Sequence, residues 1–183
     1  MAATFSFDED TGTATGSPAK GTTRTSPATD ANWKNSGVVT DAYSAYPITA
    51  GNNSFQKAIF GHFSGSFNQI SAGLFAHTAG DFASNLTLKG VIAMVADASR
   101  WLYVTPSAVA DSNLTTDMTT AIAIGSGVAV WFGATGPEAT GKAATMATNP
   151  CYTNFLTTQL QTAVGAAAGD TAQVTLTLQY NEN

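Results

Sequence analysis

The clearest pattern of hydrophobic and polar positions lies near the end of the chain, in residues 173–180 (QVTLTLQY). Apolar and polar side chains alternate strictly there, which gives one apolar face: Val174, Leu176, Leu178 and Tyr180. This period of two predicts a half-buried antiparallel strand. Residues 155–162 (FLTTQLQT) alternate more weakly and predict a second strand before it.

Further apolar segments, separated by Gly and Asn turns, predict strands over 54–64, 67–71, 74–78, 86–96, 101–105 and 128–132. Many short strands without regular intervening helices are typical of an all-β, antiparallel β-sandwich, Ig-like or jelly-roll-like. A barrel is the alternative. A parallel α/β sheet is disfavoured, because the amphipathic crossover helices that it requires are missing.

Two positions leave local alternatives open. Leu114, Met118 and Ile122 are spaced by four, which allows one or two helical turns within 107–124, although the Ala, Thr and Asn content opposes a helix. Gly90 interrupts the strand predicted over 86–96 and is interpreted as a bulge.

Residues 8–37 form a block of Asp, Thr, Gly, Ser and Pro with Trp33 as the only large apolar side chain. Such a composition predicts an extended arm or a chain of turns. We therefore divide the chain into an extended N-terminal arm, 1–37, and a β-sandwich domain, 38–183. A solvated linker and an arm that orders against a neighbouring subunit both remain open, and Trp33 favours the second as an aromatic anchor.

Composition narrows the function classes. Only 10% of the residues are charged, the net charge is −5, and the seven basic residues are scattered singly. Nucleic-acid binding requires clustered Lys and Arg, so it is not expected. No apolar stretch is long enough to span a membrane as a helix, and residues 1–5 lack the pattern of a signal peptide. The single cysteine allows no internal disulfide and fits folding in a reducing cytoplasm.

Titratable residues form no recognisable active-site pattern. His62 and His77 lie in predicted strands and would face each other if these strands were neighbours, but a zinc site needs two more ligands and the nearest candidates, Asp81 and Asp97, lack metal-like spacing. We interpret both histidines as partly buried structural residues.

The remaining motifs are read as structural too. Asp8, Asp10 and Gly12 resemble the start of an EF-hand loop, but the later ligand positions do not fit, so a solvated acidic turn is predicted. Cys151 has no histidine paired with it and is predicted to be a small buried apolar residue. We therefore expect a protein that is not an enzyme, with no catalytic, cofactor-binding or metal-binding residues.

Aromatic residues near turns are the candidate contact residues. Trp33, Tyr43 and Tyr46 are assigned to an interface, and stacking on sugar rings remains open for them. Core packing is the preferred interpretation of Trp101.

Residues 45–80 contain YPITAGNNSF, then FSGSF with an isoleucine three residues on, then SAG and TAG; residues 173–182 read QVTLTLQYNE. Both segments, 45–80 and 159–183, resemble a group of tailed-bacteriophage virion proteins, whereas residues 1–37 carry none of the resemblance. The resemblance implies a structural component of a phage particle with a β-sandwich core, and it implies no catalytic residues.

The sequence thus predicts a bacteriophage virion protein, most specifically a capsid decoration (cement) protein that stabilises the shell by inter-subunit contacts. A tail, neck or fibre protein and a carbohydrate-binding or adhesion module are the alternatives. The expected partners are the major capsid protein or other virion proteins and further copies of the chain, in particles assembled in the host bacterial cytoplasm. The arm and Trp33 are expected to make inter-subunit contacts, so deleting residues 1–37 should leave a folded domain.

Overall fold

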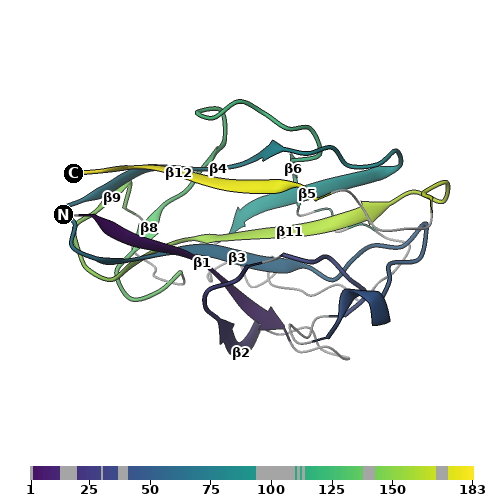
Figure 1. Cartoon of the computed structure of the whole chain (residues 1–183), viewed down its shortest axis with the longest axis horizontal. Helices are drawn as coiled ribbons and strands as arrows, with labels where there is room; N and C mark the ends of the chain where they lie inside the picture. Colours follow the sequence, from purple (N-terminus) through teal and green to yellow (C-terminus); the bar gives the residue numbers. More distant parts are fainter. Residues whose placement is uncertain are drawn as a thin grey trace.

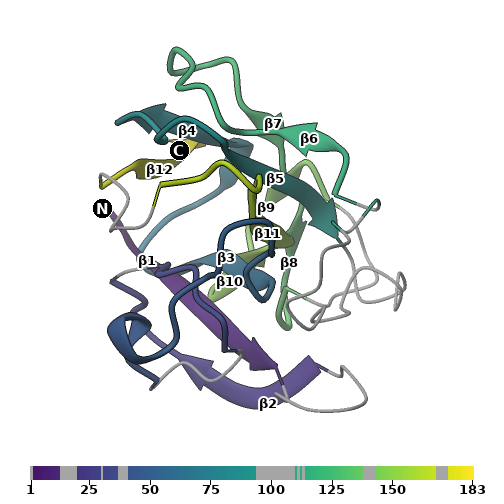
Figure 2. The ribbon, with the colours of Figure 1, turned by 90° about the vertical axis from the view of Figure 1, so that its right-hand side faces the viewer.

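The computed structural model describes residues 2–12, 20–29, 31–36, 41–93, 110, 112, 114–137, 143–167 and 173–183. These residues form two antiparallel β-sheets packed face to face, and the larger sheet curls into a half-barrel (Figures 1 and 2). The predicted antiparallel β-sandwich is confirmed. The strand predicted over 101–105, with Trp101, lies outside the described residues.

The large sheet has the order β2-β1-β3-β11-β5-β6, and β10 pairs with both β3 and β8. Its strands are β1 (Ala3–Gly12), β2 (Lys20–Thr25), β3 (Lys57–Gly65), β5 (Leu86–Ala93), β6 (Thr116–Asp117), β8 (Phe132–Gly133), β10 (Cys151–Thr153) and β11 (Phe155–Thr162). The predicted strand over 155–162 is confirmed as β11, which pairs with β5 along its full length.

The small sheet has the order β12-β4-β7, with β9 paired to β4. Its strands are β4 (Ile70–Ala79), β7 (Val128–Ala129), β9 (Thr145–Met146) and β12 (Thr175–Glu182). The strictly alternating segment is confirmed as β12: Leu178 is buried, and Leu176 and Tyr180 pack against the inter-sheet core. The two strands predicted around Ala72 are a single strand, β4, in which Ala72 has a positive φ of 51°.

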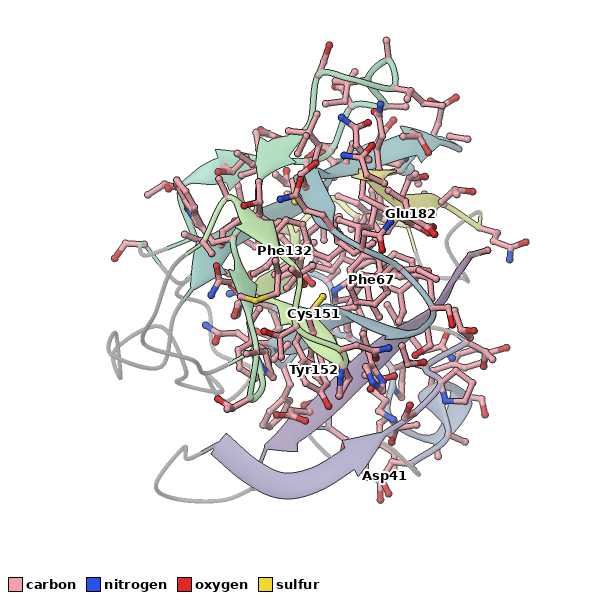
Figure 3. All side chains as sticks on the ribbon, turned by 90° about the vertical axis from the view of Figure 1, so that its left-hand side faces the viewer. Asp41, Phe67, Phe132, Cys151, Tyr152 and Glu182 are labelled. Carbon is pink, nitrogen blue, oxygen red and sulfur yellow. The ribbon has the colours of Figure 1, made fainter. Side chains whose placement is uncertain are left out.

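The core between the sheets is rich in phenylalanine. Its fully buried members include Phe63, Phe75 and Phe132, and Cys151 lies among them (Figure 3). A second, smaller cluster lies around Phe60 and Phe155 and includes Leu114. Burial of these rings is the main source of stability in such a sandwich.

The N-terminal segment is part of the sandwich, which corrects the division of the chain at residue 37. β1 pairs with β3 from Ala3 to Asp10, and Phe5 and Phe7 pack against the inter-sheet core. Trp33 packs against the same core. The sequence suggested an arm because residues 8–37 are polar, but β1 and Trp33, both in the described part of this segment, contact residues that are distant in sequence.

Both ends of the described chain lie at one end of the molecule (Figure 1). The backbone N–H of Ala3, at the start of β1, donates to Glu182 Oε1, at the end of β12, at 2.8 Å. The ring of Phe5 also contacts the ring of Tyr180, with centroids 5.9 Å apart. These contacts join the large sheet to the small one.

Two local expectations are corrected. Gly90 is not a bulge, since β5 pairs with β11 through it without a register shift; a Cβ there would lie 2.7 Å from Met118 Sδ, so close packing explains the glycine. The helical alternative for 107–124 fails over its described residues, 110, 112 and 114–124, which contain β6 and no helix. No α-helix occurs in the described ranges, where a single 3₁₀ turn, η1 (Tyr43–Ala45), is the one helical element.

Candidate interaction surface

The acidic residues of β1 are buried, which corrects the prediction of a solvated acidic turn. Asp8, Glu9 and Asp10 are 1%, 3% and 3% exposed. Glu9 Oε1 accepts a hydrogen bond from Lys57 Nζ at 2.7 Å, and Asp8 Oδ2 lies 3.4 Å from His62 Nδ1. A buried carboxylate is tolerated only with such partners, because it has lost its hydration.

A second lysine joins this buried region from the polar N-terminal segment. Lys34 is 2% exposed, and its ammonium donates to the backbone carbonyl of Asp41, whose carboxylate accepts from Ser36 Oγ. Burial and then the charge of Lys57 lower the pKa of Lys34, while Glu9 and Asp41 act in the opposite direction. Lys34 and Asp41 therefore join Glu9 of β1 and Lys57 of β3 in a network of charged groups inside the fold, which we call the buried ionic network.

The predicted interface residues do not form one site. Trp33 is half-buried and turns inward: its Nε1 donates to Thr158 Oγ1 at 3.0 Å, and its ring packs on Phe82. Tyr43 and Tyr46 are 49% and 42% exposed at η1, where the N–H of Tyr46 donates to the carbonyl of Tyr43 at 3.1 Å. The contacts of Trp33 are thus within its own chain, and only the two tyrosines stand at the surface.

The histidines are also separated. His62 belongs to β3 of the large sheet and stacks on Tyr152 at a centroid distance of 4.7 Å, whereas His77 belongs to β4 of the small sheet and is 1% exposed. Its two ring nitrogens lie 3.0 and 2.9 Å from the carbonyl oxygens of Met118 and Ala79. The two rings therefore do not face each other from neighbouring strands, and within the described ranges no group of three His, Cys, Asp or Glu residues is placed to hold a metal.

Cys151 is fully buried, as predicted, and burial raises the pKa of its thiol to about 11. At neutral pH the sulfur is therefore protonated and poorly nucleophilic.

The outer face of the small sheet has a different character. Two adjoining hollows lie on it and share Leu74; the larger, of about 380 Å³, reaches Trp131, which is 39% exposed. The residues lining the two hollows are all uncharged: Ser71, Ala72, Gly73, Leu74, Ala76, Thr78, Ile124, Gly125, Gly127, Ala129, Val130, Trp131, Ala144, Thr145, Thr177 and Gln179. We call this surface the neutral face.

One polar atom of the neutral face lacks a partner. Gln179 Oε1 is buried and accepts no hydrogen bond from the described residues. Ile124, which lines the same hollow, is 69% exposed. Exposed apolar side chains beside an unsatisfied acceptor are features of a surface that becomes covered by a partner. Sequence reasoning missed this face because its residues come from four separate segments and form no motif.

Searches against protein-family models, curated protein sequences and solved structures found no match to this chain. In the described residues, no helix is long and apolar enough to cross a membrane.

Proposed function

We propose that this chain is a structural component of a bacteriophage virion, of the capsid decoration (cement) class. The observation that carries the proposal is the neutral face, an exposed apolar and hydroxyl-bearing surface without a charged residue in its lining. The proposed role is binding rather than catalysis. The proposed partners are the major capsid protein, or another virion protein, and further copies of the chain.

A neutral face suits assembly for a physical reason. Interface cores are depleted in Lys, Glu and Asp, because a charge that loses its hydration without gaining a partner costs several kcal/mol. When a partner covers the neutral face, apolar side chains such as Ile124 and Trp131 are removed from water. No charged group of this face is buried without a partner. In a particle, the same weak contact is repeated by symmetry, so modest contacts add up.

The resemblance to tailed-phage virion proteins supports the same assignment. Its two segments, 45–80 and 159–183, include the whole of β3, β4 and β12 and the second half of β11. A tail, neck or fibre location would use the same surface chemistry.

The experiment that tests the proposal is the copy number of the chain in purified particles, measured by quantitative mass spectrometry against the major capsid protein. A ratio near that of the capsid protein is expected for a cement protein. A few copies per particle would contradict the cement assignment and favour the neck, baseplate or a fibre. Absence from the particle would overturn the virion proposal as a whole.

Carbohydrate binding is the second candidate, and the exposed pair Tyr43 and Tyr46 favours it. Tyr43 begins η1 and Tyr46 directly follows it, and exposed tyrosine rings can stack on sugars. Glycan-array binding that is lost in Tyr43→Ala/Tyr46→Ala would support this function. An array without signal for the wild-type chain would exclude the glycans that it displays.

A further inference from the structure

The C-terminal strand β12 is the edge of the small sheet. It pairs with β4 on one side, and in the described part of the chain no strand pairs with its other side. Natural edge strands are usually blunted by Lys, Pro, a bulge or short length. β12 is eight residues long, contains neither Lys nor Pro, and carries a single charged residue, Glu182. Such an edge is a template for a further strand.

The two irregularities of this pairing leave β12 itself regular. Gln179 and Asn181 pair with Leu74 and Ser71, so the extra residue belongs to β4. The same holds at the other end, where Thr175 and Leu176 pair with Ala79 and His77. The N–H and C=O groups of successive residues therefore point to alternate sides of β12 along its whole length.

The hydrogen bonds at the end of β12 fix which residues point outward. Asn183 donates to the carbonyl of Gln69 at 3.0 Å and accepts from the N–H of Gln69 at 3.1 Å, so Asn183 faces β4. Because bonding direction alternates along an antiparallel strand, the odd-numbered residues of β12 also face β4. Leu176, Leu178 and Tyr180 then direct their N–H and C=O groups toward the unpaired edge.

We propose that β12 pairs with β12 of a second copy of this chain, antiparallel and with the two-fold axis at Leu178. This register places Leu176 opposite Tyr180 and Thr177 opposite Gln179 of the second copy. Apolar side chains then oppose apolar ones and polar oppose polar. Centring on Leu178 overlaps the strands more fully than centring on Leu176 or Tyr180, and it sets Glu182 opposite Val174 rather than another charge.

The pairing also accounts for the unsatisfied atom of the neutral face. Thr177 Oγ1 and Thr78 Oγ1 share a hydrogen bond of 2.6 Å, in which either hydroxyl can be the donor. Thr78 Oγ1 also lies 3.5 Å from the carbonyl oxygen of Thr175, a longer contact. When Thr78 donates to Thr177 instead, the proton of Thr177 is available to Gln179 Oε1 of the second copy, which lies opposite. The small sheets of the two copies then form one continuous sheet with a continuous neutral face.

The inference concerns the purified chain and does not depend on the virion proposal. Sedimentation velocity over a concentration series is expected to show a monomer–dimer equilibrium. Hydrogen exchange should show protection of the Leu176, Leu178 and Tyr180 amides that increases with the dimer fraction. A monomer at all concentrations, or a dimer without this protection, would overturn the inference.

A pair of double variants tests the register. Thr177→Lys/Gln179→Lys places lysine opposite lysine twice in the dimer, whereas Thr177→Lys/Gln179→Glu places lysine opposite glutamate. Like charges directly opposite each other are unfavourable, so we expect dimerisation about tenfold weaker in the first variant than in the second. Equal dissociation constants in the two variants would overturn the register.

Two controls separate folding from pairing. Thermal unfolding at low concentration checks that both double variants fold. Val164→Lys, at an 87% exposed position in the turn that follows β11, should leave the dissociation constant unchanged. If Val164→Lys weakens dimerisation as strongly as the Lys/Lys variant, the dimer forms elsewhere and the inference fails.

Discussion

The first strand of the sandwich, β1, and the last, β12, differ in the burial of their polar side chains and in whether their outer edges are covered. β1 carries Asp8, Glu9 and Asp10, and all three are buried. Its outer edge is covered by β2 and by residue 28, whose N–H donates to the carbonyl of Phe7 at 2.6 Å. β12 has hydroxyl and amide side chains on the outer face and an edge that no described strand covers.

This difference shows that several of the few charged side chains are buried in the N-terminal region and around β3. Asp8, Glu9, Asp10, Lys34 and Lys57 are all at most 3% exposed, in a protein with seven basic and twelve acidic residues. In Figure 3, Asp41 of the buried ionic network and Glu182 at the end of β12 lie far apart on the molecule. Charge fastens the N-terminal region internally, while the small sheet is left neutral on its outside.

Among the variants that test this comparison, we expect removal of β1 to have the largest effect on folding. Deletion of residues 2–12 exposes the core under Phe5 and Phe7 and leaves Lys57 without Glu9. We expect the truncated chain not to fold, as judged by circular dichroism and proteolysis, in contrast to the sequence-based expectation for removal of 1–37. A truncated chain with a cooperative unfolding transition would show that β1 is dispensable.

The next effect concerns the ion pair of Glu9 and Lys57, whose side chains are 5% and 4% exposed. Glu9→Gln leaves a buried lysine without its counter-charge, which should lower the free energy of unfolding by about 3–5 kcal/mol in urea titrations. Glu9→Leu/Lys57→Met removes both charges and should recover most of that loss.

The exposed pair of Lys89 and Asp117 provides the matched control. Its atoms lie 2.8 Å apart, as close as the buried pair, but the side chains are 28% and 57% exposed. Lys89→Met should therefore cost only about 0–1 kcal/mol. Equal losses for Glu9→Gln and Lys89→Met would show that burial of the first pair is not what makes it important.

A smaller effect is expected in alkaline solution from Cys151. The thiol pKa is raised from 9.0 to about 11 in the fold, so ionisation favours the unfolded chain. The contribution of the protonated Cys151 thiol to the free energy of unfolding is complete below pH 9. It should fall by about 2–3 kcal/mol as the pH rises from 9 to 11. Urea titrations should show this extra decline in the wild type relative to Cys151→Ala. Parallel pH profiles would contradict it.

The smallest effect is expected on the neutral face. Ile124→Ser changes a 69% exposed residue, so the free energy of unfolding should change by less than about 0.5 kcal/mol. Calorimetry on the monomer would measure this. A loss of several kcal/mol would show that the neutral face is needed for folding and would remove the contrast with β1.

Sequence patterns predicted those strands in which apolar and polar residues alternate along the strand itself. Strict alternation located β12, and weaker alternation located β11, because each of these strands contributes apolar side chains to the sandwich core. Phe5 and Phe7 show the same alternation, and this was the available signal for β1. The acidic residues that follow obscured it.

The buried ionic network could not be predicted from local sequence. A run of Asp and Glu is typical of solvated turns, and its burial depends on Lys57 and Lys34, which are distant in sequence. Trp33 was predicted to anchor the chain to a neighbouring subunit, and the contacts that the structure shows for it are to Thr158 and Phe82 of its own chain. No local pattern distinguishes an aromatic residue that docks on its own domain from one that docks on a neighbour.

The contact between Ala3 and Glu182 has a practical consequence for protein engineering. Because β1 begins where β12 ends, a short linker from Asn183 to Ala2 would join the two ends with little strain. New termini could then be opened at the exposed turn of Val164 and Gly165. Such a circular permutant would display a fused tag or cargo at this turn instead of beside the contact between Ala3 and Glu182.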